Sequence, residues 1–372
     1  MRIALSGGRS PLALFFGKKL KQQGHEIFML EHLSPTFATY SSIFTKVQVV
    51  ASPVFHWETF RMEVLNFLEV TDIELFLPIN EETLYYGLLQ EEIRALGTTF
   101  LIGSQDLLEK LHNKLDFINW CKDIGLTAPK TELYQGHSID FSSQLLKPVY
   151  SRFGQSVITS EIELVQKQPK AKMIVQEKIV GQQICVSLII RESRLISYCA
   201  YDTNLGIENY ASITYIPFEH ATLTQIVKRL SENLGDQGIF SFDFMFDGEN
   251  FFSIECNPRL TFGSILDSQR ILAGLLEENG SSLSEVNQTH YGIKLLWLGK
   301  ILYHREWRKT FRLYRQSRDV LAEAFDWQTW LWMPWVLMSY FIKARKRKLS
   351  ITDYVVHDIS YPYQQSSKGE ME

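Results

Sequence analysis

The sequence predicts a mixed fold in which an α/β region is followed by an α+β region and then by a helical region. Short apolar strands alternate with helices over residues 1–103, a pattern typical of a parallel sheet covered on both faces. Residues 104–290 contain longer strands in succession, which favours antiparallel pairing. Residues 291–372 hold six of the eight tryptophans and form helix-like runs. We therefore expect three domains with these boundaries.

The length, composition and net charge of the chain argue against several classes of protein. A chain of 372 residues is long enough for several domains with cores of their own, and 45% hydrophobic and 22% charged residues are ordinary for a soluble enzyme. The net charge of −4 argues against a general nucleic-acid-binding surface. Four cysteines without metal or disulfide spacing favour a reducing cytoplasm. We expect no signal peptide at MRIALSGG and no membrane-spanning helix.

The first region begins with a buried strand at residues 2–6, followed by a Gly7-Gly8 turn into a helix over 11–23. This turn suits a phosphate at a helix N-terminus, but GGRS lacks the third glycine of a dinucleotide-binding motif, which favours a plain tight turn. The same alternation continues to residue 102. Its elements are strands at 26–30, 47–50, 73–79 and 99–102 and helices at 57–68 and 81–95.

The second region opens with two helices, the second of which ends before Gly125 and Pro129. A strand then ends in Lys147-Pro148, and the loop after it contains Arg152 and Gly154. The elements that follow are a helix at 160–166, strands at 173–177, 183–190 and 194–201, and helices at 221–234 and 264–276.

The clearest pattern in the chain is GIFSFDFMFDGENFFSIECNPRL, residues 238–260. Apolar and polar side chains alternate on both sides of an Asp247–Asn250 turn, which predicts two strands with one apolar face each. The two apolar sets are Phe240, Phe242, Phe244 and Phe246 on the first strand, and Phe252, Ile254 and Cys256 on the second.

If these strands form a hairpin, a three-residue Gly248–Asn250 loop brings both apolar sets to one face. Asp243 then lies opposite Glu255, with Cβ atoms about 5 Å apart, and Asn257 follows on the same face. Two carboxylates and an amide oxygen are ligands that suit Mg²⁺ or Mn²⁺. An ordinary exposed hairpin with acidic residues on its solvent face fits the same pattern. Arg259 adds a guanidinium directly after the strand.

The third region is rich in tryptophan and basic residues. One helix-like run covers 293–317, and a second apolar run covers 327–342 and ends in a basic cluster at 343–348. The second run is too short and too interrupted to span a bilayer. Tryptophan followed by basic residues matches a helix that lies on an anionic membrane surface, here 327–348. A helical flap packed on the rest of the protein or on a second subunit of a homodimer, with its lysines solvated, fits the same pattern, and we favour it over the membrane helix.

Residues 1–290 resemble the ATP-grasp superfamily, which contains carboxylate–amine ligases and biotin-dependent carboxylase subunits. The strongest match is SFDFMF…FFSIECNPR, including the twelve-residue gap between its two acids. The resemblance implies a Rossmann-like pre-ATP-grasp domain, then an ATP-grasp fold with a lid subdomain at about 145–178, and here a helical C-terminal extension.

The resemblance also implies roles for individual residues. Asp243, Glu255 and Asn257 would hold one or two Mg²⁺ (or Mn²⁺) ions on ATP, and Arg259 would stabilise the transferring phosphate or the substrate carboxylate. The residues expected to bind ATP itself are Lys114 and Lys147 at the phosphates, and Glu177 and Lys178 at the adenine hinge.

The lid loop, SRFGQS, departs from the glycine-rich family pattern, so Arg152 and Gly154 are expected to cover the phosphates instead. Gln182-Gln183 stands where many members place a glutamate, which puts ribose or metal contacts there in doubt.

The resemblance predicts a cytoplasmic ATP-dependent carbon–nitrogen ligase. A small-molecule carboxylate would become an acylphosphate with release of ADP, and an amine would then displace phosphate. The alternatives are a bicarbonate-phosphorylating carboxylase or carbamoyl-phosphate-type enzyme, and a membrane-docked ATP-binding regulatory protein without ligation. By position, Arg9, Glu81, Arg152 and residues 201–210 are candidates for the acceptor pocket. No nucleic-acid partner is expected.

Overall fold

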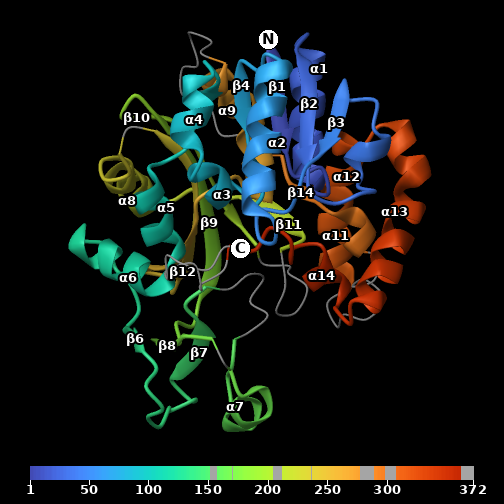
Figure 1. Ribbon diagram of the computed structural model, residues 1–372. Helices are drawn as coiled ribbons and strands as arrows, with labels where there is room; N and C mark the ends of the chain where they lie inside the picture. Colours follow the sequence, from blue (N-terminus) through green and yellow to red (C-terminus); the bar gives the residue numbers. More distant parts are fainter. Residues whose placement is uncertain are drawn as a thin grey trace. The chain divides into compact units, whose positions relative to one another are not determined.

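The computed structural model describes residues 1–150, 157–169, 171–203, 212–235, 237–276, 289–297 and 307–361 (Figure 1). They fall into two compact units. The first unit joins residues 1–105 to 259–268 and to the chain from Asp319 onward, and the second comprises 106–258 and 269–318. The domain boundaries expected at residues 103 and 290 remain predictions. Among the described residues no helix has both the length and the apolar character needed to cross a membrane.

The first unit contains a five-stranded parallel sheet, which confirms the α/β prediction. Its central strands are almost entirely apolar and buried, as expected for a sheet covered on both faces. The strand order is β3 (Lys46–Val49), β2 (Glu26–Glu31), β1 (Arg2–Ser6), β4 (Leu75–Leu77) and β5 (Thr99–Phe100).

The helices of this unit follow local sequence signals. In α1 (Pro11–Gln22), the Ser10 side chain accepts a hydrogen bond from the Leu12 N–H and proline occupies the first helical position. After α2 (Trp57–Val70), the single helix expected over 81–95 is divided into α3 (Thr83–Gly87) and α4 (Gln90–Ala95). The break follows Gly87, a residue type of low helix propensity.

The Gly7-Gly8 turn is a tight turn closed by the protein's own carboxylates. Gly7 has φ +82°, and a Cβ atom there would lie 2.3 Å from Asn80 Nδ2. The Ser6 hydroxyl donates to Glu82 Oε1 at 2.6 Å, and the Arg9 N–H donates to Glu31 Oε2 at 2.8 Å. The Ser6 hydroxyl and the Arg9 N–H are thus already used, which favours the tight turn over a phosphate site.

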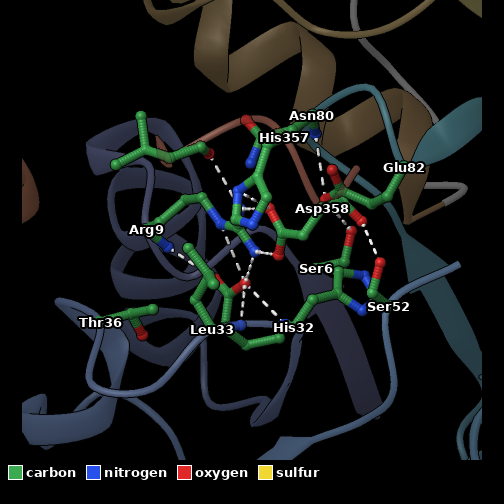
Figure 2. A network of polar contacts seen from close by, with 12 residues as sticks. Ser6, Arg9, His32, Leu33, Thr36, Ser52, Asn80, Glu82, His357 and Asp358 are labelled. Carbon is green, nitrogen blue, oxygen red and sulfur yellow. Dashed lines mark hydrogen bonds and ion pairs between the residues drawn. The ribbon is translucent and has the colours of Figure 1, made fainter. Parts of the chain in front are cut away.

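A buried ion-pair network joins the beginning of the chain to its end. Arg9 donates Nη1 to Asp358 Oδ1 at 2.6 Å and Nη2 to Asp358 Oδ2 at 2.9 Å, and its Nε donates to Glu31 Oε1 at 3.0 Å. Figure 2 shows the Arg9 and Asp358 side chains facing each other within this network. Burial opposes ionisation of Asp358, but the charge and hydrogen bonding of Arg9, together with His32 and His357, outweigh it and the pKa of Asp358 is lowered. Arg9, a candidate for the acceptor pocket, is committed to this network.

The C-terminal helices pack on the same unit. One face of α13 (Trp327–Lys346) joins α14 (Ile351–Tyr354) and Leu33 in a buried cluster formed by Leu33, Val336, Tyr340, Ala344 and Tyr354. Asp326 begins α13: its Oδ1 accepts from the Thr329 N–H, and its Oδ2 accepts from the N–H of Ser42, close to η1 (Ala38–Tyr40). Ahead of it, α12 (Val320–Ala324) packs against α1. The helical flap is thus packed on the enzyme through one face.

The second unit is an α+β structure with antiparallel pairing. Its large sheet has the order β13 (Phe251–Asn257), β12 (Gly238–Phe246), β9 (Gln182–Arg191), β10 (Arg194–Asp202), β11 (Thr214–Pro217), β14 (Tyr291–Gly292) and β15 (Arg318–Asp319). A smaller sheet has the order β6 (Thr131–Leu133), β8 (Met173–Glu177) and β7 (Gln144–Pro148), with α7 (Glu161–Lys167) between β7 and β8 in sequence.

The remaining helices match the sequence in part. The helix expected at 264–276 is a 3₁₀ turn, η2 (Phe262–Asp267), that continues as α9 (Ser268–Leu275). Of the run at 293–317, residues 298–306 lie outside the described residues, and α11 (Trp307–Gln316) forms the end. The other helices are α5 (Gln105–His112), α6 (Lys114–Asp123) and α8 (Ala221–Ser231).

We predict that Arg9→Ala destabilises the first unit by about 3–5 kcal/mol, because it leaves the Glu31 and Asp358 carboxylates buried without their cation. Thermal unfolding followed by circular dichroism measures the effect. Arg61→Ala is the matched control, since it breaks an exposed Arg61–Glu92 pair and is expected to cost less than about 1 kcal/mol. Equal losses in the two variants would contradict the prediction.

Candidate nucleotide and metal site

The β12–β13 hairpin brings the two predicted acids together. Asp243 pairs with Glu255, and Ser241 pairs with Asn257, which confirms the expected register at this end of the hairpin. The loop itself differs, because Phe246 pairs with Phe251 and four residues, not three, connect the strands. The register then shifts by one residue beyond Asp243, so that Phe244 faces Ser253. A bulge at Ile254 therefore produces the predicted Asp243–Glu255 pair.

The bulge also changes which residues of β13 are buried. Phe251 and Ser253 are buried, whereas Phe252 and Ile254, which were expected on the apolar face, are only half-buried. Beyond the bulge the prediction is correct again, with Cys256 buried. The reason is the period of two along a strand: one extra residue turns all preceding side chains to the other face.

A network within the turn stabilises the four-residue loop. Asp247 Oδ1 accepts hydrogen bonds from the N–H groups of Glu249 and Asn250 at 2.8 and 2.7 Å, an arrangement that aspartate favours in turns. Gly248 has φ +106°, in the region that favours glycine. The Phe246 and Phe251 rings, one on each side of the loop, stack with centroids 4.3 Å apart.

Two buried lysines face the acids. Lys114 is the first residue of α6, and its backbone N–H donates to the Val149 carbonyl at the end of β7, the strand that carries Lys147. Its Nζ lies 3.3 Å from Glu255 Oε2. Lys114 and Lys147 are only 4% and 5% exposed. Lysine is rarely buried to this extent without a partner, so their positions indicate a functional charge cluster.

The charges in this cluster influence one another. Burial lowers the pKa of Lys147 to about 8, although Glu255 favours its charged form. For Glu255, burial opposes ionisation, but Lys114 and Lys147 outweigh it and the pKa is lowered. The Asp243 carboxyl also interacts with that of Glu255. Lys114 and Lys147 therefore keep Glu255 ionised within the cluster.

Cys185 lies beside Asp243, a position that the sequence did not predict. It lies on β9 opposite Asp243 and on the other side opposite Tyr201 of β10. Burial raises the pKa of the thiol well above its usual value, and the Asp243 carboxylate raises it further, so this thiol stays neutral. Only strand pairing across β9, β10 and β12 places it there, and no local motif signals it.

The expected hinge residues lie at the end of β8, and their N–H groups are already used inside the unit. The Glu177 N–H donates to the Lys130 carbonyl at 2.9 Å, and the Lys178 N–H donates to the Ser143 carbonyl at 2.8 Å. The Lys178 Nζ donates to the Phe141 carbonyl. Arg152 and Gly154, the expected phosphate cover, lie outside the described residues.

Arg259 belongs to the first unit, where its Nη2 lies 3.7 Å from Glu81 Oε1 and its Nη1 donates to the Leu260 carbonyl at 3.1 Å. Within the second unit, the structure brings together Lys114, Lys147, Asp243 and Glu255.

Residues 111–263 match the family model described as an ATP-grasp domain. This segment is an ATP-grasp domain. It includes both buried lysines and the whole β12–β13 hairpin. The ATP-grasp resemblance predicted from the hairpin motif is confirmed for residues 111–263.

Solved structures with the same fold include a ligase, a synthase and the biotin carboxylase domain of a carboxylase. An L-amino acid ligase from Bacillus licheniformis is 14% identical, with a TM-score of 0.56 over 71% of this chain and 68% of that one. A carboxyaminoimidazole ribonucleotide synthase from Aspergillus clavatus, complexed with ATP, is 11% identical, with a TM-score of 0.59 over 77% and 78%. The biotin carboxylase domain of a Hydrogenobacter thermophilus 2-oxoglutarate carboxylase, a dimer in complex with MgADP, ADP and bicarbonate, is 14% identical, with a TM-score of 0.59 over 77% and 73%. At these identities the likeness shows the fold.

The donor set of the ATP-grasp domain fits Mg²⁺ and a nucleotide. Among the described residues, no three His, Cys, Asp or Glu side chains form a metal-binding group. Asp243 and Glu255 supply two carboxylates, so the third protein ligand would be the amide oxygen of Asn257. Such a sparse all-oxygen set suits Mg²⁺, which keeps waters and takes phosphate oxygens as its other ligands.

We predict that Lys147→Met weakens ATP binding at least ~10-fold while stabilising the free protein by up to about 3 kcal/mol. The folded pKa of about 8 lies below the usual 10.5, so burying the charge costs stability below pH 8 and the cost fades as pH rises toward 10.5. Calorimetric ATP titration and thermal unfolding across this pH range measure both effects. Lys122→Met, at an exposed position on α6, is the control. A Lys147→Met protein that is less stable or binds ATP normally would contradict the prediction.

Proposed function

We propose that the protein is an ATP-dependent ligase that activates a substrate carboxylate as an acylphosphate and joins it to an amine. The observation that carries this proposal is the charge cluster inside the ATP-grasp domain, in which buried Lys114 and Lys147 face half-buried Asp243 and Glu255. A polyphosphate is bound by localised positive charges and a divalent ion. The lysines of this cluster supply the charges, and its carboxylates are ligands for such an ion.

Lys114 and Lys147 would bind the phosphates of ATP. In the free protein Lys114 is paired with Glu255 at 3.3 Å, so each group partly neutralises the other. Both lysines are almost inaccessible to water, which strengthens their attraction for phosphate compared with an exposed lysine. The cluster would then bind ATP by exchanging an internal ion pair for contacts with phosphate and metal.

Asp243, Glu255 and Asn257 would hold one or two Mg²⁺ (or Mn²⁺) ions, which neutralise the charge on the phosphates when bound. Arg259 would stabilise the transferring phosphate or the substrate carboxylate. Glu177 and Lys178 would lie beside the adenine, and because their own N–H groups are used within the unit, these N–H groups are not its donors. Arg152 and Gly154 would cover the phosphates.

The reaction needs no covalent bond to the protein. A carboxylate oxygen of the substrate attacks the γ-phosphorus, and the bond to the bridging oxygen breaks to release ADP. The amine nitrogen then attacks the acyl carbon, phosphate leaves, and the nitrogen loses a proton. The protein contributes positioning and charge neutralisation, the main sources of catalysis in phosphoryl transfer.

We propose small-molecule carboxylate and amine substrates and a cytoplasmic location, where the four free cysteines stay reduced. A homodimer remains part of this proposal, and the Hydrogenobacter thermophilus domain of the same fold is described as a dimer.

Replacing either acid should abolish turnover. We expect Glu255→Gln and Asp243→Asn to reduce substrate-stimulated ADP release at least ~100-fold, because the phosphates lose their metal. The assay is a screen of carboxylates and amines for stimulated ADP release, followed by kinetics of folded variants. Glu249→Gln, in the exposed loop of the same hairpin, should retain full activity. Wild-type turnover in the two acid variants would rule out the proposed site.

The same assay separates the alternative functions. ADP release that depends on bicarbonate and needs no amine would indicate the carboxylase or carbamoyl-phosphate-type reaction. Tight ATP binding without ADP release for any acid would indicate a regulatory ATP-binding protein.

A further inference from the structure

Helix α13 exposes an apolar face that the fold leaves uncovered by the described residues. Trp327 and Leu331 are 71% and 65% exposed, and the side chains that follow them at spacings of three and four residues are also exposed. At about 100° per residue these positions occupy one half of the helix surface. The face consists of Trp327, Trp330, Leu331, Pro334, Trp335, Leu337, Met338, Phe341 and Ile342.

Helix α13 is apolar on both sides, unlike a normal surface helix. Its packed side combines Val336, Tyr340 and Ala344 with the buried Thr329 and Ser339. No charged residue occurs on the outer face before Arg345. A contiguous apolar patch of this kind on a soluble protein marks an interaction surface.

The end of the same face is strongly basic. Arg345 and Lys346 continue the face after Ile342, and Lys348 follows directly; all three are exposed. Tryptophans on an apolar face next to a basic cluster combine the two contributions that bind interfacial helices to anionic bilayers. At 20 residues, or about 30 Å, the helix offers a long flat contact.

Charge argues against a second copy of the chain as the occupant. In an antiparallel pairing of two α13 helices, the basic end of one helix would meet the start of the other. The described acids near that start are Asp326, which accepts hydrogen bonds from Ser42 and Thr329, and Glu323, which pairs with Lys19. In a parallel pairing, the basic ends would repel each other. The chain's last residues, 362–372, are mostly polar and poorly suited to cover an apolar face.

We propose that α13 docks the protein on an anionic phospholipid bilayer, lying in the plane of the interface with its apolar face in the headgroup region and its basic end on the phosphates. The packed side of the helix stays attached to the first unit through Val336 and Tyr340. Docking would hold the enzyme beside the membrane without a spanning segment.

The test is co-flotation of the full-length protein with phosphatidylcholine vesicles that do or do not contain phosphatidylglycerol. We expect binding only to the anionic vesicles. Trp327→Gln with Leu331→Gln should lower the partition coefficient at least ~10-fold, because two apolar side chains leave the bilayer. Arg345→Gln with Lys346→Gln should lower it by about fivefold per charge removed, and high salt should mimic this loss.

A control variant, Met62→Gln with Val70→Gln, removes two apolar side chains of similar exposure from α2 and should bind vesicles like the wild type. Absence of flotation at any anionic lipid content, or equal flotation of the Trp327/Leu331 variant, would overturn the proposal. So would a dimer in sedimentation velocity that becomes monomeric in that variant without any vesicle binding, since a second copy would then occupy the face.

Discussion

The second unit depends on a balance of charge between two buried lysines and two half-buried carboxylates. Lys114, Lys147, Asp243 and Glu255 come from a helix and three strands, and each carboxylate offsets part of the cost of burying the lysine charges. The free protein satisfies the balance internally, mainly through the 3.3 Å contact between Lys114 and Glu255. The lowered pKa of Lys147 shows that the balance is incomplete and leaves a poorly solvated cation ready for an anion. Part of the free energy of folding is thus stored as affinity for a polyanionic ligand.

In the first unit, buried charges stabilise the fold and are not available to a ligand. Arg9 is saturated by Glu31 and Asp358, with two hydrogen bonds to the Asp358 carboxylate alone, and it also donates to the Val355 carbonyl. A guanidinium matches such planar bidentate partners, whereas the ammonium groups of Lys114 and Lys147 are point charges that can exchange partners. The structural cluster of the first unit therefore contains arginine, whereas the proposed binding cluster of the second unit contains lysine.

The sequence predicted local structure well and tertiary placement poorly. The strand pattern gave β1 and β8 with correct limits and gave the Asp243–Glu255 pair. The alternation of apolar and polar residues did not predict the bulge at Ile254. Asp247 stabilises a four-residue turn, which requires a one-residue shift in the strand pairing, and alternation alone does not indicate such a shift. Cys185 and Asp358 were missed because their partners are far away in sequence. The residue types of the hairpin indicated its chemistry. Pairing between strands distant in sequence determines which other residues lie next to it.

The first unit is discontinuous in sequence, with its sheet at the start of the chain and its last helices at the end. During synthesis, Arg9 and Glu31 leave the ribosome long before Asp358, so for most of translation the future ion-pair site holds one cation and one carboxylate. The second unit, by contrast, has all of its strands except β15 before residue 293. Its folding can therefore precede completion of the unit that brackets it, because contacts between distant residues form last. Truncation near the C-terminus would remove a structural element of the N-terminal sheet domain, although the affected residues lie hundreds of positions away.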